Sequence, residues 1–164
     1  MPTSVHCFYG IKSPLSNFHP ARFVIDGLEY SCVEQYMQAE KARMFGDTER
    51  GEQIMKAATP LAMKRLGRQV TPFDKDVWAS RSRDVVETGL RAKFTQNPEL
   101  RAALLLTGEA VIVECAPRDR LWGAGLGRVR VEQIAAETPA GAKLALRGRN
   151  MLGALLMRVR TELN

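Results

Sequence analysis

A short stretch in the N-terminal third of the chain carries a carboxylate, an amide and an amine at helical spacing. These groups belong to Glu34, Gln38 and Lys41. In an α-helix the first and the last of them lie about 20° apart around the axis and about 10 Å apart along it. Such a stripe could line a cleft that performs acid–base or nucleophilic chemistry. It could equally be an ordinary solvated helix face, where Glu and Lys at this spacing are common.

Glu34 also has a possible structural role. We expect a helix from about residue 32 to residue 44, with Ser31 as its N-cap. A glutamate at the third helical position then completes a capping box with that serine. On this interpretation the carboxylate holds the start of its own helix and does nothing else.

Three further groups of residues have the chemistry of a binding site. They are Ser16-Asn17-Phe18, Trp78 with Arg81, and Asp119 with Trp122, Gly123 and Gly125. A tryptophan ring beside glycine backbone suits stacking on a planar base, and alternate glycines let the backbone approach a neighbour closely. Each group has a structural alternative: a core anchor at Trp78, local ion pairs at Asp119, and a rigid packed turn at Trp122.

The bulk properties are those of a folded protein with one domain, residues 1–164. No apolar run approaches the ~20 residues that span a bilayer. The first residues lack a basic segment followed by a hydrophobic stretch, so we predict no signal peptide and a cytoplasmic location. Three cysteines without a C-x-x-C and two histidines without an H-E-x-x-H predict neither a disulfide framework nor a zinc site.

The chain is basic, with 24 Lys and Arg against 18 Asp and Glu and a net charge of +6. This balance favours anionic partners such as phosphorylated metabolites, nucleotides or nucleic acid. The basic residues are scattered and no aromatic residues are interleaved with them in a stripe. Nucleic-acid binding is therefore possible but not indicated.

Local patterns predict short strands and mostly helices. Asp26-Gly27 predicts a hairpin turn, and Asn150 is the predicted cap of the last helix. The stretch 128–146 is predicted as a loop or a frayed helix. The strands are expected at 5–9, 22–25, 28–30 and 110–115, and the helices at 32–44, 48–58, 60–67, 76–94, 98–107 and 150–163.

The groups described above are part of a longer pattern that runs from about residue 8 to residue 163. Its members are Leu15-Ser16-Asn17-Phe18, Asp26-Gly27, Tyr30, Glu34, Tyr36, Gln38 to Lys41, Leu66-Gly67-Arg68, Trp78, Lys93-Phe94, Leu104-Leu105-Leu106, Asp119, Trp122-Gly123, Gly125, Gly148, Asn150, Leu152-Gly153 and Leu155-Leu156-Met157. In order and spacing this pattern resembles the NADAR domain family, also called YbiA-like. The chain departs from it at Leu146, where many members carry a tryptophan.

The resemblance implies a single α+β domain, mostly α-helical, with about six to eight helices and a few short strands. It implies an N-glycosidase that cleaves the bond between a ribose C1 and a nitrogen, without a metal or an organic cofactor. One branch of the family acts on ribosylamino-pyrimidine phosphates, early intermediates of riboflavin synthesis, and we expect that substrate class here. Another branch removes ADP-ribose from guanine, and only then is nucleic acid a partner. A non-catalytic module that binds ADP-ribose or NAD is the third alternative.

Carried over residue by residue, the resemblance makes Glu34, Lys41 and Asp119 the candidate catalytic residues. A carboxylate can stabilise the positive charge that builds on C1 or activate water. A lysine deprotonated by burial can instead displace the base and form a Schiff base, and both routes stay open. Backbone amides in 123–127 and arginine side chains could hold phosphate. The candidate substrate-binding residues are Ser16, Asn17, Phe18, Trp78, Arg81, Trp122, Gly123 and Gly125.

Overall fold

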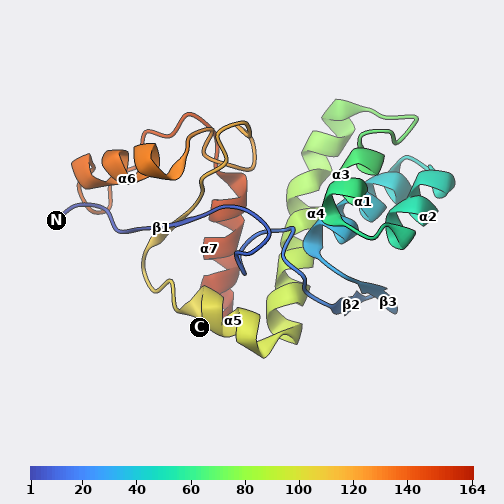
Figure 1. The fold of residues 1–164 in the computed structure, drawn as a ribbon, viewed down its shortest axis with the longest axis horizontal. Helices are drawn as coiled ribbons and strands as arrows, with labels where there is room; N and C mark the ends of the chain where they lie inside the picture. The colour runs from blue at the N-terminus through green and yellow to red at the C-terminus, as the bar shows by residue number, and fades with distance from the viewer. The chain divides into compact units, whose positions relative to one another are not determined.

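The computed structural model describes residues 1–164 and contains seven helices and four short strands. The expected α+β, mostly α-helical class is confirmed. The chain divides into two compact units (Figure 1). Residues 17–98 form the first, which we call the central unit, and residues 1–16 with 99–164 form the second, the terminal unit. No helix in the structure combines the length and the apolar character that crossing a membrane requires.

The central unit begins with a β-hairpin. Its strands are β2 (Phe23–Ile25) and β3 (Leu28–Tyr30), which pair antiparallel. The two turn residues, Asp26 and Gly27, have φ angles of 50° and 79°. This left-handed backbone is what the favoured two-residue hairpin turn requires, and Asp-Gly adopts it readily. The predicted hairpin is confirmed.

Four helices complete the central unit. They are α1 (Val33–Met44), α2 (Thr48–Lys56), α3 (Pro60–Gly67) and α4 (Lys75–Gln96). Helix α1 contacts each of the other three. Polar side chains cap the starts of α2, α3 and α4 by accepting bonds from backbone N–H groups, as the local sequence indicates. Helix α1 is therefore the element around which this unit is built.

The core of the central unit joins the hairpin to α1 through aromatic rings. Tyr30 lies edge-on to Tyr36, with ring centroids 5.1 Å apart, and Phe23 stacks on Tyr30 at 5.8 Å. On α4, a Cβ at Gly89 would stand 2.9 Å from the Tyr36 ring and 3.3 Å from Val33. A side chain at this position would push α4 away from α1. Close approach of the two helices therefore requires the glycine that weakens α4 as a helix.

The terminal unit is built on one pair of parallel strands. Strand β1 (Val5–Phe8) pairs with β4 (Val111–Glu114), with Cys7 opposite Val113. Helix α6 packs against β1 and helix α7 against β4. The three helices of this part of the chain are α5 (Pro98–Leu105), α6 (Arg128–Glu137) and α7 (Met151–Leu163).

Two sequence-based expectations for the terminal unit need correction or completion. The undetermined stretch 128–146 contains a regular helix, α6, whose buried residues Val131 and Ile134 pack in a core with Cys7 and Cys115. Asn150 stands at the N-cap of α7, but its side chain does not cap that helix. It donates to the Ile112 carbonyl (2.9 Å) and accepts from the Glu114 N–H (3.0 Å), so it ties α7 to β4 instead.

Candidate active site

The predicted capping box at the start of α1 is wrong, which removes the structural role considered for Glu34. The N-cap is Cys32, and no side chain caps this end. It is Gln35, one position later, whose Oε1 accepts a hydrogen bond from the backbone N–H of Ser31 (2.8 Å). Gln35 also donates to the Ile54 carbonyl (3.2 Å). The Glu34 carboxyl therefore does not cap its own helix.

Glu34 is a buried acid, 6% exposed, on α1. Its Oε1 accepts a hydrogen bond from Nε2 of Gln38 at 2.9 Å, one helical turn away. Burial raises the pKa of this carboxyl, whereas the Gln38 hydrogen bond and the charges of Lys64, Lys41 and Arg68 act in the opposite direction. Burial outweighs them because removing a carboxylate from water destabilises its charged form. Glu34 can therefore hold a proton at a higher pH than an exposed glutamate.

Lys41 lies at the far end of the same helical stripe and is half-buried between two aromatic rings. Its Nζ is 4.7 Å from the centroid of the Phe73 ring and 5.7 Å from that of Trp78. Burial lowers the pKa of this amine; the Glu34 carboxylate opposes that shift and Arg68 reinforces it. A lysine with a lowered pKa supplies more neutral amine near pH 7, the form that acts as a nucleophile.

Two oxygen atoms near Glu34 are buried without a hydrogen-bond partner. They are Oδ1 of Asn17 and Oε1 of Gln38. The backbone carbonyl of Asn17 accepts from the Glu34 N–H (3.0 Å), which places Asn17 beside the acid. The Gln38 amide packs so closely on Gly67 that any Cβ there would overlap Oε1. Unsatisfied buried acceptors are rare and costly, so these two oxygens have the capacity to accept hydrogen bonds beside Glu34.

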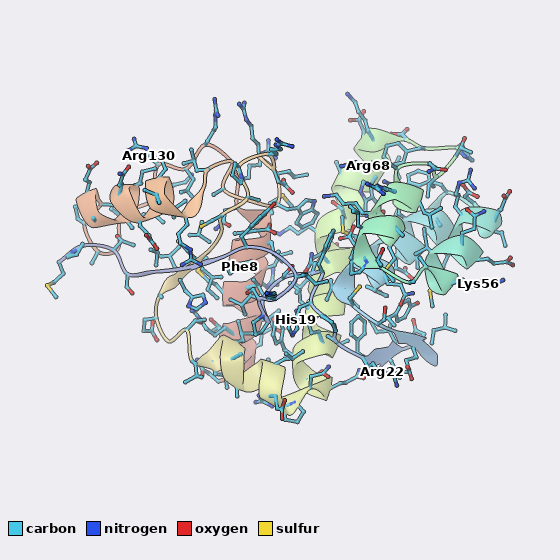
Figure 2. All side chains as sticks on the ribbon, in the orientation of Figure 1. Phe8, His19, Arg22, Lys56, Arg68 and Arg130 are labelled. Carbon is cyan, nitrogen blue, oxygen red and sulfur yellow. The ribbon has the colours of Figure 1, made fainter.

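The structure adds residues that the sequence analysis did not select. Phe73 and Lys64 border the site, the latter with its Nζ 5.8 Å from the centroid of the Phe18 ring. Arg68, labelled in Figure 2, follows directly after α3 and acts on the charges of both Glu34 and Lys41. Arg68 is within the family pattern and Lys64 belongs to the basic group Lys64-Arg65, whereas the local sequence does not distinguish Phe73.

The central unit thus holds six of the predicted site residues. Asn17 adjoins Glu34, Phe18 lies against Lys64, and Trp78 lies against Lys41. Trp78 is partly buried on α4 and is not one of the fully buried core residues. Arg81 is exposed about one turn further along α4. The remaining five, Ser16, Asp119, Trp122, Gly123 and Gly125, belong to the terminal unit.

In the terminal unit, Asp119 makes local bonds. Its Oδ1 accepts from the backbone N–H groups of Leu121 (3.0 Å) and Trp122 (2.8 Å), which closes the turn that carries the tryptophan. These bonds use one carboxylate oxygen of Asp119 to fix the conformation of the loop. A catalytic role for this aspartate stays a prediction.

The glycines after Trp122 are close to other parts of the same chain. A Cβ at Gly123 would stand 2.8 Å from the Cβ of Ala116, and Gly125 has a φ of 64°. The N–H of Gly125 donates to the Asp119 carbonyl (3.0 Å) and that of Ala124 to Glu114 (2.8 Å). These two amides are therefore engaged within the loop, and a phosphate contact from the other amides of 123–127 stays a prediction. The glycines serve the packing of the loop itself.

Comparison with known proteins identifies the relatives of this chain. The family model for the NADAR domain matches residues 7–164. The chain is 41% identical over 134 residues to N-glycosidase R617 of Acanthamoeba polyphaga mimivirus, which covers 82% of this chain and 75% of that protein. It is 34% identical over 148 residues to N-glycosidase YbiA of Escherichia coli, covering 90% of this chain and 79% of YbiA.

A solved structure and a longer relative extend the comparison. The NMR structure of E. coli YbiA matches with a TM-score of 0.76 and 33% identity, over 99% of this chain and 86% of that one. A riboflavin biosynthesis protein of Vibrio vulnificus is 30% identical over 149 residues. That match covers 91% of this chain but 35% of the longer protein.

Proposed function

We propose that this chain, which belongs to the NADAR domain family, removes the base from a ribosylamino-pyrimidine phosphate. As a member of that family with N-glycosidases among its relatives, it is a hydrolase that acts on N-glycosyl bonds. The likeness to a riboflavin biosynthesis protein supports the pyrimidine substrate class. The products would be ribose phosphate and the free aminopyrimidine.

One observation carries the proposal: an acid and an amine with opposite pKa shifts lie on one face of α1. Burial raises the pKa of Glu34 and lowers that of Lys41, which favours the neutral form of each group. A protonated acid and a neutral amine are the pair that displacement of a basic leaving group by a nucleophile needs. An ordinary solvated helix face would hold both groups charged.

The reaction begins with attack of the Lys41 Nζ on ribose C1. The C1–N bond to the pyrimidine breaks, and Glu34 gives its proton to the departing nitrogen, so that the base leaves as a neutral amine. The lysine nitrogen then returns a proton to the Glu34 carboxylate. Opening of the ribose ring converts the C1–lysine bond into a Schiff base. Water adds to C1, the bond from C1 to Nζ breaks, and ribose phosphate and the free amine are released.

The surroundings of Glu34 suit a ribose ring. The unpartnered oxygens of Asn17 and Gln38 would accept hydrogen bonds from donors such as sugar hydroxyl groups. The partly buried Trp78 ring would stack on the planar pyrimidine. Phe18 and Arg81 are the other proposed substrate-binding residues of the central unit. For Ser16, Asp119, Trp122, Gly123 and Gly125 of the terminal unit, a role in the reaction stays a prediction from the sequence.

The experiment that tests this proposal is reduction with borohydride during turnover of a ribosylamino-pyrimidine phosphate, followed by measurement of the intact protein mass. We expect an added mass equal to reduced ribose phosphate. Lys41→Arg should lose the adduct, because a guanidinium forms no Schiff base, whereas the matched variant Lys64→Arg should keep it.

The other outcomes separate the alternatives. Rapid hydrolysis without any adduct would replace the Schiff base by direct attack of water. An adduct formed only from an ADP-ribosylated guanine would assign the second substrate class. Wild-type turnover in both Lys41→Arg and Glu34→Gln would end the assignment of the site.

A further inference from the structure

A cavity of about 570 Å³ lies in the terminal unit and is lined by none of the site residues proposed above. We call it the basic cavity. Its volume is in the range of sites that take small molecules. Its lining combines two kinds of side chain, aliphatic and cationic. The aliphatic residues are Val111, Leu144, Leu146, Ala154 and Met157, and the cationic ones are Lys143, Arg147 and Arg149.

The cations of the basic cavity are exposed and have no acidic partner. None of Lys143, Arg147 and Arg149 forms an ion pair or a side-chain hydrogen bond. The same is true of Arg118 and Arg120 in the preceding loop. Five positive side chains in two short segments thus lack the compensation that surface charges of mixed sign usually provide.

Other arginines of the terminal unit are partnered, which makes the contrast informative. Arg128 pairs with Glu132 (3.6 Å) and Arg158 with Glu162 (3.8 Å). Arg101 and Arg160 donate to carbonyl oxygens at 2.7 and 2.9 Å. The absence of partners is therefore a property of the two segments around the basic cavity and does not extend to this unit as a whole.

The two basic segments are held together through their backbones. An ideal Cβ at Gly125 would be 3.1 Å from the Arg120 Cγ and 3.3 Å from the Arg147 Cβ, so these two side chains start from neighbouring points. The only acid in either segment, Asp119, directs one oxygen to the N–H groups of its own turn. Like charges held close repel one another, and a bound anion would remove that repulsion.

The frame that holds these arginines is a row of hydrogen bonds between residues 148–152 and 120–124. Consecutive N–H groups of the first segment donate to carbonyls of the second, among them Gly148 to Ala124 (2.6 Å), Arg149 to Arg120 (2.7 Å) and Met151 to Leu121 (3.1 Å). The first backbone N–H groups of α7 donate to carbonyls in this row of hydrogen bonds. Anion binding at the basic cavity would therefore come from side chains, and not from the end of the helix.

We propose that the basic cavity binds a small ligand that joins phosphate to an apolar or planar group, the chemistry of a nucleoside phosphate. The guanidinium groups of Arg147 and Arg149 offer paired donors to phosphate oxygens, and Lys143 adds a third charge. The aliphatic lining receives the face of the base or another apolar group. This site lies within the terminal unit and does not depend on the proposed reaction.

The test is calorimetric titration of the full chain at low salt with uridine diphosphate, a representative nucleoside diphosphate. The double variant Arg147→Ala/Arg149→Ala should weaken binding by about tenfold or more. Arg130→Ala is the matched control, because Arg130, labelled in Figure 2, is an exposed arginine on α6 that contacts only Gln133 (3.4 Å). It should bind as the wild type does. Equal affinities in both variants would overturn the proposal.

Further variants and ligands identify the ligand class, and they distinguish a lost contact from a misfolded protein. Lys143→Ala removes an exposed charge and should by itself weaken binding about threefold. Uridine diphosphate should bind more tightly than pyrophosphate, and Met157→Gln should reduce that preference; equal binding of the two ligands would refute the apolar half of the site. An oligothymidylate that binds tenfold more tightly than the nucleotide, through Arg118 and Arg120, would assign the phosphate to a nucleic-acid backbone.

Discussion

The two units of this protein use their polar residues in opposite ways. In the central unit the acid Glu34 is buried and the amine Lys41 is half-buried against two aromatic rings. Burial shifts the pKa of each group in the direction that favours its neutral form. In the terminal unit the polar side chains of Asp119 and Asn150 bond to the backbone, and five cations are exposed without partners. The first arrangement suits proton transfer and nucleophilic attack. The second fixes the conformation of the backbone and presents positive charge at the surface.

This difference means that substitutions should separate by unit. A group whose charge is unfavourable in its surroundings reduces stability while it supplies reactivity, so its replacement should affect activity more than folding. A group that ties backbone segments together contributes to folding directly. We therefore expect losses of turnover in the central unit and losses of stability in the terminal unit.

The largest effect should follow substitution of the two proposed catalytic groups. Lys41→Ala and Glu34→Gln should each lower kcat by about 10³-fold, the range for loss of a nucleophile or a general acid. Thermal unfolding should change little, because neither residue holds secondary structure in place. Steady-state rates and melting curves of the same preparations test this. A variant that loses its rate only because it unfolds would contradict the proposed division.

Replacing one glycine in each unit by alanine should show the difference between the units in stability and turnover. At Gly148 a Cβ would overlap the Gly123 carbonyl and lie 2.8 Å from the Arg120 Cα, so backbone must move. We expect Gly148→Ala to lower the free energy of unfolding by about 3 kcal/mol. At Gly67 the three atoms nearest to such a Cβ all belong to the Gln38 side chain, and none is backbone.

Gly67→Ala should therefore displace Gln38 from Glu34 and reduce turnover with a smaller loss of stability. Denaturant titration and steady-state kinetics of both variants make the comparison. Greater destabilisation at Gly67 than at Gly148 would reverse it.

A smaller loss of stability is expected at Asn150. Asn150→Asp keeps the acceptor for the Glu114 N–H but turns the donor to Ile112 into a second acceptor facing a carbonyl. We expect a loss of about 2 kcal/mol in the free energy of unfolding. Asn97→Asp is a matched control, because its amide also donates to a backbone carbonyl but in a more exposed place. Equal losses at both positions would show that burial at Asn150 has no effect.

The smallest effect concerns the pH dependence of stability. Burial raises the folded-state pKa of Glu34 above its ordinary value of 4.5, so the folded protein retains this proton to higher pH than the unfolded chain. Stability therefore falls as pH rises from the ordinary to the raised pKa. Glu34→Gln cannot ionise and should be more stable than the wild type above that window, and equally stable below it.

Melting temperatures from pH 4 to pH 9 measure this difference, and each 1 kcal/mol corresponds to about 2–4 °C in a chain of this size. Glu49→Gln, at an exposed glutamate on α2, controls for the loss of one surface carboxyl. A wild type more stable than Glu34→Gln at pH 8 would show that the carboxylate is favoured by its surroundings, contrary to the raised pKa.

The local sequence predicted the elements well because their signals are local. Asp26-Gly27 requires only its own backbone to form a turn, and Thr59-Pro60 contains both the cap and the first residue of α3. The incorrect predictions also have physical reasons. The box at α1 was assigned to Glu34, but its neighbour Gln35 bonds to Ser31, and the choice depends on Ile54 in α2, which offers Gln35 its second partner.

The order of residues by itself determined the family, the helices and strands, and the acid and the amine seven positions apart, because these depend on residue identity and helical period. Only the tertiary structure decided that Glu34 is buried and free of capping, that Phe73 and Trp78 flank Lys41, and that the glycines near Trp122 meet backbone of the same chain. Burial and contacts between distant segments set pKa values and packing, and neither follows from local spacing.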